Sequence, residues 1–219
     1  MYDKNVIYKR MTGYGMKGRL ETDVLMSGET SFAIGGPADI LFVPDNVAEA
    51  VRTVRLCRRE AIPLTILGNG TNVLVRDGGI RGVVIKLGGF CGLRRERDRI
   101  FAGAGAALTG VSRFARDESL SGLEFACGIP GSVGGAVCMN AGAYSGEIKD
   151  AVYRSVILER NGDIGMVDNA GHAFSYRKSV FQENGNIIIE TEFLLSHCPK
   201  NEITQKMDEY DGKDRKSVV

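Results

Sequence analysis

The segment from Cys127 to Tyr144 constrains the fold of this chain more than any other, because small residues recur along nearly all of it. It runs Cys-Gly-Ile-Pro-Gly-Ser-Val-Gly-Gly-Ala-Val-Cys-Met-Asn-Ala-Gly-Ala-Tyr. Small side chains let a backbone lie directly against a planar ring or a diphosphate. Residues 132–139 are expected to form a short helix whose first N–H groups face an anion. The alternative is a close helix packing contact through Gly134 and Gly135, which leaves the flanking Pro-Gly and Asn-Ala-Gly turns unexplained.

Two further glycine-rich segments precede it, in a chain with 29 glycines among 219 residues. The first, at 68–72, lies between two apolar runs, and the N–H groups of such a turn can converge on phosphate oxygens. An ordinary strand-to-strand turn remains the alternative there. The second begins Gly103-Ala104-Gly105, after an apolar strand and before a helix. A Rossmann fingerprint is disfavoured, because Leu108 takes its third glycine position and no acidic residue follows at the required distance.

Apolar patterns predict an α+β domain of two packed subdomains, without the regular alternation of a doubly wound sheet. A helix is expected after Asn46, whose side chain can cap it, and another at 108–117. A hairpin is expected around Asn161-Gly162, with strands at 152–159 and 165–167. Further strands are expected at 39–43, 64–67, 73–75, 83–87, 100–102 and 187–195.

Composition narrows the class of partner and the compartment. A net charge of +1 gives no basic excess for nucleic acid, so a small molecule is the expected partner. Five cysteines without C-x-x-C spacing predict reduced thiols rather than a zinc ribbon or a disulfide framework. No run is long and apolar enough for a membrane span and no signal peptide is evident, so a cytoplasmic location is expected. Nothing in the sequence sets the oligomeric state.

Histidine chemistry is also limited. His172 and His197 are the only two histidines, and neither has a partner for a catalytic triad or a metal site. No metal is therefore expected, and both rings are expected to be solvated or hydrogen-bonded to the backbone.

Four motifs, in order along the chain, resemble those of the UDP-N-acetylenolpyruvoylglucosamine reductases. Gly68 to Val75 is similar to their G-x-G-S-N-x-L-V turn, with Thr71 in place of serine. The other three motifs are Thr30 to Asp39, Ser121 to Tyr144, and Phe174 to Phe181, which carries Y-R-x-S-x-F. The resemblance implies the two-subdomain FAD-binding fold of the vanillyl-alcohol-oxidase (PCMH) type. It implies an N-terminal arm at 1–29, an FAD-binding domain at 30–196 and the start of an incomplete C-terminal substrate domain at 197–219.

The resemblance also implies an activity. Members of the family reduce UDP-N-acetylglucosamine-enolpyruvate, a nucleotide sugar, to UDP-N-acetylmuramate for peptidoglycan synthesis, with FAD as cofactor and NADPH as hydride donor. Arg177 is then expected to be the catalytic group that stabilises negative charge beside the substrate carboxylate, and Tyr176 to contact substrate. The expected cofactor-binding residues are Gly68, Asn69, Gly70, Thr71, Asn72, Gly105, Gly122, Ile129, Pro130, Gly131, Ser132, Val133, Gly134, Gly135, Asn140 and Ala143.

Two alternatives stay open. Another oxidoreductase of the flavin superfamily is disfavoured by the Tyr176-Arg177 pair and by the lack of a histidine for covalent flavin in the first glycine turn. A non-catalytic FAD-binding fragment is the second alternative, because the family's serine proton donor and late glutamate have no counterpart here. Turnover is therefore expected to be impaired, and Ser179 is the first residue to consider as a substitute proton donor.

Overall fold

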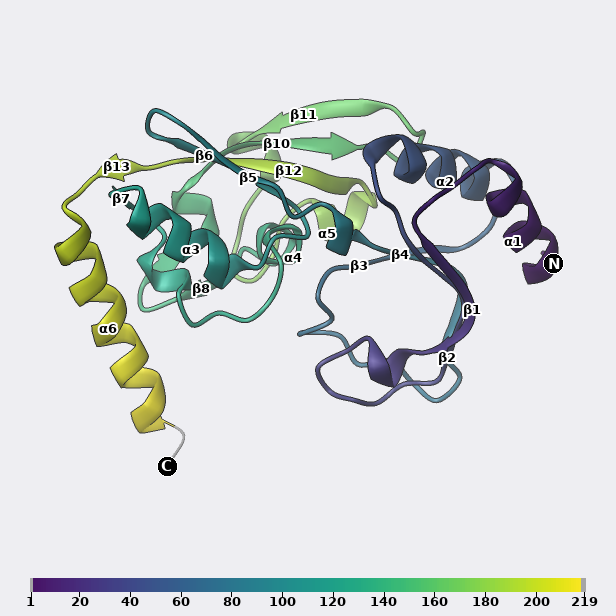
Figure 1. Cartoon of the computed structure of the whole chain (residues 1–219), viewed down its shortest axis with the longest axis horizontal. Coiled ribbons are helices and arrows are strands. Elements are labelled where there is room, and N and C mark those ends of the chain that lie inside the picture. The colour runs from purple at the N-terminus through teal and green to yellow at the C-terminus, as the bar shows by residue number, and fades with distance from the viewer. Residues whose placement is uncertain (1, 218–219) are drawn as a thin grey trace. The chain divides into compact units, whose positions relative to one another are not determined.

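The computed structural model describes residues 2–217, and side-chain environments up to residue 213. The chain divides into two compact units (Figure 1). Unit 1 comprises the residues up to Phe90 together with Leu158–Gly165, and unit 2 comprises Cys91–Ile157 and the residues from Met166 onward.

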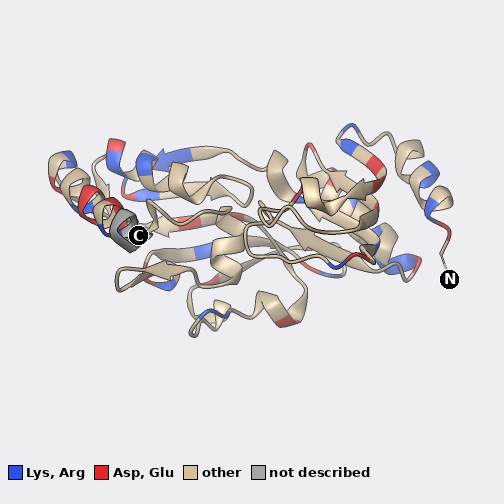
Figure 2. Cartoon of the chain, turned by 90° about the horizontal axis from the view of Figure 1, so that it is seen from below, with Lys and Arg blue, Asp and Glu red and all other residues tan. Residues whose placement is uncertain are grey.

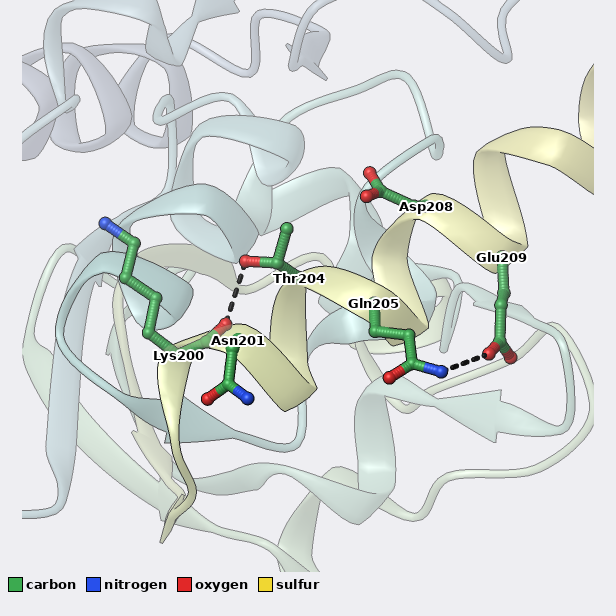
Figure 3. A pocket seen from close by; sticks show the side chains of 6 residues that line it. All are labelled: Lys200, Asn201, Thr204, Gln205, Asp208 and Glu209. Carbon is green, nitrogen blue, oxygen red and sulfur yellow. Dashed lines mark hydrogen bonds between the residues drawn. The ribbon is translucent and has the colours of Figure 1, made fainter.

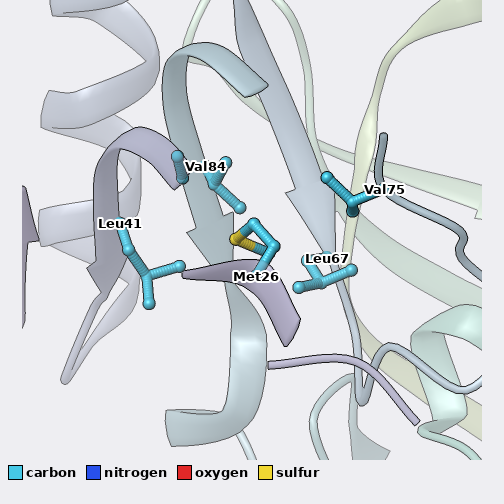
Figure 4. Packing of buried hydrophobic residues seen from close by; sticks show 6 residues of the cluster. Met26, Leu41, Leu67, Val75 and Val84 are labelled. Carbon is cyan, nitrogen blue, oxygen red and sulfur yellow. The ribbon is translucent and has the colours of Figure 1, made fainter. Parts of the chain in front are cut away.

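Unit 1 is built on a four-stranded sheet in the order β1-β2-β4-β3. Strand β1 pairs antiparallel with β2, whereas β2 and β3 both pair parallel with β4. Its elements are α1 (Lys4–Gly13), β1 (Arg19–Leu25), η1 (Met26–Gly28), β2 (Pro37–Val43), α2 (Val47–Arg59), β3 (Leu64–Leu67), β4 (Ile80–Lys86) and η2 (Leu87–Gly89). Side chains from strands and loops form one apolar cluster in its core, which includes Met26, Leu41, Leu67, Val75 and Val84 (Figure 4).

Helix α2 shows how the sequence sets a local structure in this unit. Its N-cap is Asn46, whose side-chain oxygen accepts the N–H of Glu49 over 3.0 Å, as expected. The Glu49 carboxylate does not complete a capping box, because it accepts the N–H groups of Lys17, Gly18 and Asp45 instead. Burial alone would raise the pKa of Glu49, but these backbone donors lower it overall. The carboxylate thus fixes the segment before β1 to the start of α2.

Unit 2 is built on a five-stranded sheet in the order β11-β10-β12-β6-β5, whose β10–β11 tip is assigned to unit 1. The strands are β5 (Leu93–Glu96), β6 (Arg99–Gly103), β10 (Val152–Leu158), β11 (Ile164–Asp168) and β12 (Ile187–Leu194). Two short pairs join β13 (Ser196–His197) to β7 (Leu120–Ser121) and β8 (Gly142–Ala143) to β9 (Gly146–Glu147). The helices are α3 (Leu108–Asp117), η3 (Glu124–Ala126), α4 (Val133–Cys138), η4 (Ile148–Asp150), η5 (Ala170–His172), α5 (Phe181–Asn184) and α6 (Lys200–Ser217).

Most expected elements are present within a few residues of their predicted bounds, and α3 matches its prediction at both ends. The strand expected at 73–75 is wrong. Only Val75 is buried there, Val73 and Leu74 are exposed, and the segment pairs with no strand among the described residues. An isolated apolar run cannot form a strand without a neighbour to accept its backbone hydrogen bonds.

The two ends of the described chain are folded. In the range expected to be an arm, β1 pairs with β2 from Arg19 to Leu25, and Ile7 and Met11 of α1 are buried. At the other end, Ile203 and Met207 of α6 pack against Cys127. Basic and acidic residues are interspersed along this last helix (Figure 2). Both ends thus belong to folded units, whereas the expected domain boundaries at 29 and 196 stay predictions.

None of the described helices combines the length and the apolar character needed to cross a membrane. All five cysteines are free thiols.

Candidate functional site

The two glycine-rich segments of unit 2, after β6 and before α4, lie side by side. Ala107 and Ser132 form an antiparallel bridge, and the N–H of Leu108 donates to the carbonyl of Gly131 over 3.0 Å. The expected cofactor residues of these two segments therefore lie close together in unit 2. The third glycine-rich segment, the Gly68–Asn72 turn, belongs to unit 1.

The N-terminus of α4 does not present free N–H groups to an anion, which corrects the expectation for this helix. The N–H of Val133 donates to the carbonyl of Ala106, and the N–H of Gly134 to that of Ala104. The N–H of Gly135 is directed at the hydroxyl of the N-cap residue, Ser132. These three N–H groups already donate within the protein, so they are not available to an anion. The backbone at the start of this helix therefore holds the two glycine-rich segments together. At Gly134 the packing interpretation is the one that the geometry supports.

The turn after β3 packs closely on the segment before β2. Gly70 has φ +69°, and a Cβ at this position would lie 2.5 Å from the carbonyl oxygen of Glu29. The carbonyl of Gly70 accepts the N–H of Ser31. Asn69 and Asn72 are exposed, and among the residues whose side chains are described, 2–213, their side chains hydrogen-bond to no other residue. The side-chain amides of Asn69 and Asn72 are therefore available to a ligand. The backbone conformation at Gly70, between them, requires glycine.

Exposed apolar side chains flank this turn. The N–H of Gly36 donates to the carbonyl of Arg76, which holds the two flanking segments together. Large apolar side chains are exposed on both segments: Phe32, Ile34, Val73 and Leu74. Exposed apolar groups gathered beside polar ones are typical of a ligand or partner site. This part of unit 1 has the character required for a flat, partly apolar cofactor.

The Tyr176-Arg177 pair occupies the tip of a tight turn in unit 2. Ser175 and Lys178 exchange two backbone hydrogen bonds, of 3.0 and 3.2 Å, across the pair. Tyr176 is 84% exposed, Arg177 is also exposed, and the guanidinium carbon lies 6.0 Å from the centre of the Tyr176 ring. Arg177 has φ +55°, an uncommon conformation for a bulky residue. Such conformations are concentrated at functional sites.

The far side of the turn is fixed to the end of α4. The side-chain amide of Gln182 donates to the carbonyls of Arg177 and Cys138. The hydroxyl of Ser179 donates to the same Cys138 carbonyl over 2.7 Å. Ser179 is only 1% exposed. Its position does not support the role of substitute proton donor, because the hydroxyl is buried and its proton is already engaged.

The other expected cofactor residues divide by burial. Ser132, Val133 and Asn140 are buried, so their side chains are not exposed to solvent. Gly122 is exposed at φ +132° beside Leu195. In unit 1, Gly68 and Thr71 are half-buried. The remaining residues, all in unit 2, are exposed or half-buried: Gly105, Ile129, Pro130, Gly131, Gly134, Gly135 and Ala143.

A buried histidine network was missed by the sequence analysis. The Nδ1 of His172 lies 2.5 Å from the carbonyl of Asp168, and its Nε2 lies 2.9 Å from the hydroxyl of Ser155. Because a carbonyl only accepts, we assign the proton to Nδ1, and Nε2 accepts from Ser155, whose oxygen also lies 3.1 Å from that of Thr191. Burial lowers the pKa of His172. The ring is bonded to the backbone as expected, but it is not solvated.

Other candidate sites are weaker. Within the described residues, no group of three or more His, Cys, Asp or Glu could hold a metal ion. An open hollow of about 810 Å³ lies on one face of α6 (Figure 3), with hydrogen bonds from Thr204 to Lys200 and from Gln205 to Glu209 within the helix. Its lining residues all come from this helix: Lys200, Asn201, Thr204, Gln205, Asp208 and Glu209. A hollow on one helix face encloses no ligand.

Comparison with known proteins first defines the class. Residues 38–168 match the family described as FAD binding domain. The 6-hydroxy-D-nicotine oxidase of Arthrobacter nicotinovorans has the same fold, with a TM-score of 0.62 at 13% identity over 83% of this chain and 43% of that chain. The chain therefore contains an FAD-binding domain, with the α+β fold of the vanillyl-alcohol-oxidase (PCMH) type that the sequence predicted.

More similar proteins identify the family. UDP-N-acetylenolpyruvoylglucosamine reductase 2 of Bacillus cereus is 41% identical over 203 residues, which are 93% of this chain and 67% of the relative. The crystal structure of UDP-N-acetylenolpyruvylglucosamine reductase from Thermus caldophilus matches with a TM-score of 0.79 and 34% identity, over 90% of this chain and 70% of that chain. The chain belongs to the UDP-N-acetylenolpyruvoylglucosamine reductase family. It spans about two thirds of the length of the curated relatives that it matches.

Proposed function

We propose that the chain binds FAD without a covalent bond and takes part in the reduction of UDP-N-acetylglucosamine-enolpyruvate to UDP-N-acetylmuramate. NADPH is the proposed hydride donor and the cytoplasm the proposed location. The observation that carries the proposal is the 41% identity to a named reductase over 93% of this chain. The exposed Tyr176-Arg177 pair and the glycine turn of unit 1 support it at the level of single residues.

The residues of the unit 1 turn would hold the cofactor. Gly70 keeps the turn free of a Cβ at its closest approach to Glu29, and the exposed amides of Asn69 and Asn72 can donate to phosphate oxygens. The exposed apolar residues beside the turn would cover ring surface. When bound, FAD supplies the hydride chemistry that no side chain of the chain can supply.

Arg177 would act on the substrate. Its guanidinium is planar and can pair with a carboxylate through two parallel hydrogen bonds. Negative charge grows beside the substrate carboxylate during reduction, so a fixed guanidinium there stabilises the transition state more than the ground state. Tyr176 adds an exposed ring and hydroxyl next to it.

A second candidate function is flavin binding without turnover of this substrate. It is favoured by one observation, that the family model matched by residues 38–168 describes FAD binding and names no reaction.

Flavin binding itself is tested by incubating the purified protein with FAD and separating free flavin by gel filtration. We expect a yellow protein with visible flavin absorbance. Asn72→Ala should weaken FAD binding by roughly tenfold or more, because a hydrogen bond to a charged group contributes about 1.5–3 kcal/mol. Asn161→Ala, at an exposed asparagine of the β10–β11 turn, is the matched control and should bind FAD normally. A protein that stays colourless after incubation refutes the proposal.

A further inference from the structure

We propose that Asn140 is the positioning residue for the Tyr176-Arg177 turn. Its side-chain amide donates to the carbonyl of Ser175 over 3.0 Å and to the carboxylate of Glu147 over 3.0 Å. Its side-chain oxygen accepts the N–H of Lys149 over 3.0 Å. Asn140 is 1% exposed. One buried amide therefore joins the segment after α4, the β9–η4 segment and the turn.

This arrangement changes the role expected for Asn140. The sequence places it among the cofactor-binding residues, but both of its N–H donors are directed at protein oxygens. A buried donor with a protein partner loses a hydrogen bond if it turns toward a ligand. The backbone conformation also selects the residue type, because φ is +42° and asparagine tolerates the left-handed region better than most residues.

The hydrogen bond from Asn140 to the carbonyl of Ser175 lies at the start of the turn. Ser175 is the first residue of the turn, and its carbonyl also accepts the N–H of Lys178, which closes the turn. Gln182 holds the carbonyl of Arg177 from the other side. The backbone on either side of the Arg177 side chain is thus held by two side-chain hydrogen bonds. Asn140 donates the bond at the start of the turn, and Gln182 donates the other.

Asn140, together with Lys149 and the N–H of Asp150, also holds the carboxylate of Glu147, whose charge acts on the guanidinium. The pKa of Glu147 is lowered most by the hydrogen bond from the side chain of Lys149 and next by the bond from Asn140. The positive charge of Arg177 lowers it further. The Glu147 carboxylate held by Asn140 is therefore ionised and lies within electrostatic reach of Arg177. The catalytic meaning of this positioning rests on the proposed function of Arg177, but the positioning itself does not.

Trypsin digestion tests directly whether Asn140 holds the turn in place, because Arg177 and Lys178 are exposed cleavage sites in the turn. Asn140→Asp retains an oxygen for the N–H of Lys149 and tolerates positive φ, but it removes both N–H donors. Cleavage after Arg177 or Lys178 should rise roughly tenfold or more. Loss of the hydrogen bond to Ser175 costs on the order of 1.4 kcal/mol, a factor of ten in the population of the open turn, and the new carboxylate also repels that of Glu147. Asn169→Ala is the matched control. It removes two side-chain bonds to the carbonyls of Lys149 and Val152 in unit 2 and should leave cleavage in the turn unchanged.

A spectroscopic measurement separates positioning from general loosening. The chain contains no tryptophan, so Tyr176→Trp places a single indole at the tip of the turn. In the flavin-free protein, adding Asn140→Asp should lower the fluorescence anisotropy of this indole, and adding Asn169→Ala should not. Unchanged cleavage and anisotropy with Asn140→Asp would overturn the inference, and so would equal changes in both variants. If the turn loosens with Asn140→Asp but Arg177→Lys leaves substrate binding intact, the positioning stands and the proposed role of Arg177 fails.

Discussion

The N–H of Gly134 donates to the carbonyl of Ala104 over 2.8 Å, so the first turn of α4 lies directly on the loop after β6. A Cβ at position 134 would lie 3.0 Å from the Cβ of Ala104 and 3.2 Å from its carbonyl oxygen. We predict that Gly134→Val lowers the free energy of unfolding by about 1–3 kcal/mol, because overpacking displaces one of the two segments. It should weaken flavin binding as a consequence. Urea unfolding and flavin titration measure the two effects.

Gly110→Ala provides the control for that substitution. Gly110 lies inside α3, and the nearest atom to its added Cβ would be the Ala107 Cβ at 3.8 Å, an ordinary contact. Alanine in a helix interior should raise the free energy of unfolding by about 0.5–1 kcal/mol. If Gly134→Val unfolded at the same urea concentration as the unsubstituted protein, close packing would not be the reason for glycine at 134.

Gly70→Ala should destabilise unit 1. The position has φ +69°, and its Cβ would lie 2.5 Å from the carbonyl oxygen of Glu29, which is backbone and cannot rotate away. Strain of this kind costs on the order of 1–3 kcal/mol. Thermal unfolding should show a lower Tm, and FAD retention after gel filtration should fall. Gly78→Ala is the control, since no atom lies within 4 Å of the added Cβ. Equal Tm values for the two variants would contradict the prediction.

Much of the fold could be predicted because its signals are local. Helix α3 and the Asn46 cap of α2 are defined by apolar spacing and by one side chain within a few residues. Strand β1 could not be predicted in this way, because it shows no apolar alternation and most of its residues are exposed. It forms because β2 offers hydrogen-bond partners from Arg19↔Val43 to Leu25↔Pro37. A distant strand, rather than its own residues, decides its conformation.

The candidate site was predictable in its residue types but not in its hydrogen bonds. Small residues around Gly134 indicate close approach, yet the sequence does not tell whether the neighbour is a ligand or the carbonyl of Ala104. Asn140 was recognised as part of the motif, but its bond to Ser175 spans 35 residues of sequence. The backbone bond of His172 agrees with one of its two expected environments, but its burial was not predicted, because burial depends on stacking with Phe174 and on edge contact with Phe181.

His172 predicts a pH dependence of stability. Burial lowers its pKa in the folded state below the unfolded value of about 6.5. Below about pH 6.5 the unfolded state therefore binds more protons, and the free energy of unfolding falls as the pH is lowered toward the folded pKa. The contribution is fully present above pH ~6.5, and its slope is at most about 1.4 kcal/mol per pH unit.

Urea unfolding at a series of pH values between about 7.5 and about 5.5 measures this slope. His172→Gln should remove it, whatever its effect on stability at neutral pH. His197→Gln, at an exposed histidine, should retain it. A slope that survives His172→Gln would assign the pH dependence to another group.

Substrate binding is the sharpest test of Arg177. Arg177→Lys keeps the positive charge but loses the planar fork, so it should weaken binding of UDP-N-acetylglucosamine-enolpyruvate by about tenfold, roughly one bond of a bidentate pair. Changes in flavin absorbance on adding the substrate report the binding. Arg58→Lys, on the exposed face of α2, is the control and should bind as the unsubstituted chain does. Equal affinities in all three proteins would place the substrate carboxylate elsewhere.

Turnover by these 219 residues should be slow even when FAD is bound. The resemblance implies a serine proton donor that none of the four motifs contains, and Ser179 is buried with its hydroxyl bonded to the carbonyl of Cys138. Loss of a general acid typically costs about 10²–10⁴ in rate. NADPH should still reduce the flavin, at a low rate, because hydride transfer to an open flavin face requires no proton donor. The enolpyruvyl substrate should add little to that rate. NADPH oxidation followed with and without that substrate measures both steps.

Substrate-dependent turnover near ~10 s⁻¹, an ordinary enzyme rate, would show that another group in the chain donates the proton. Since Ser179→Ala removes only a structural hydrogen bond, it should then leave that turnover within about tenfold of the unsubstituted chain.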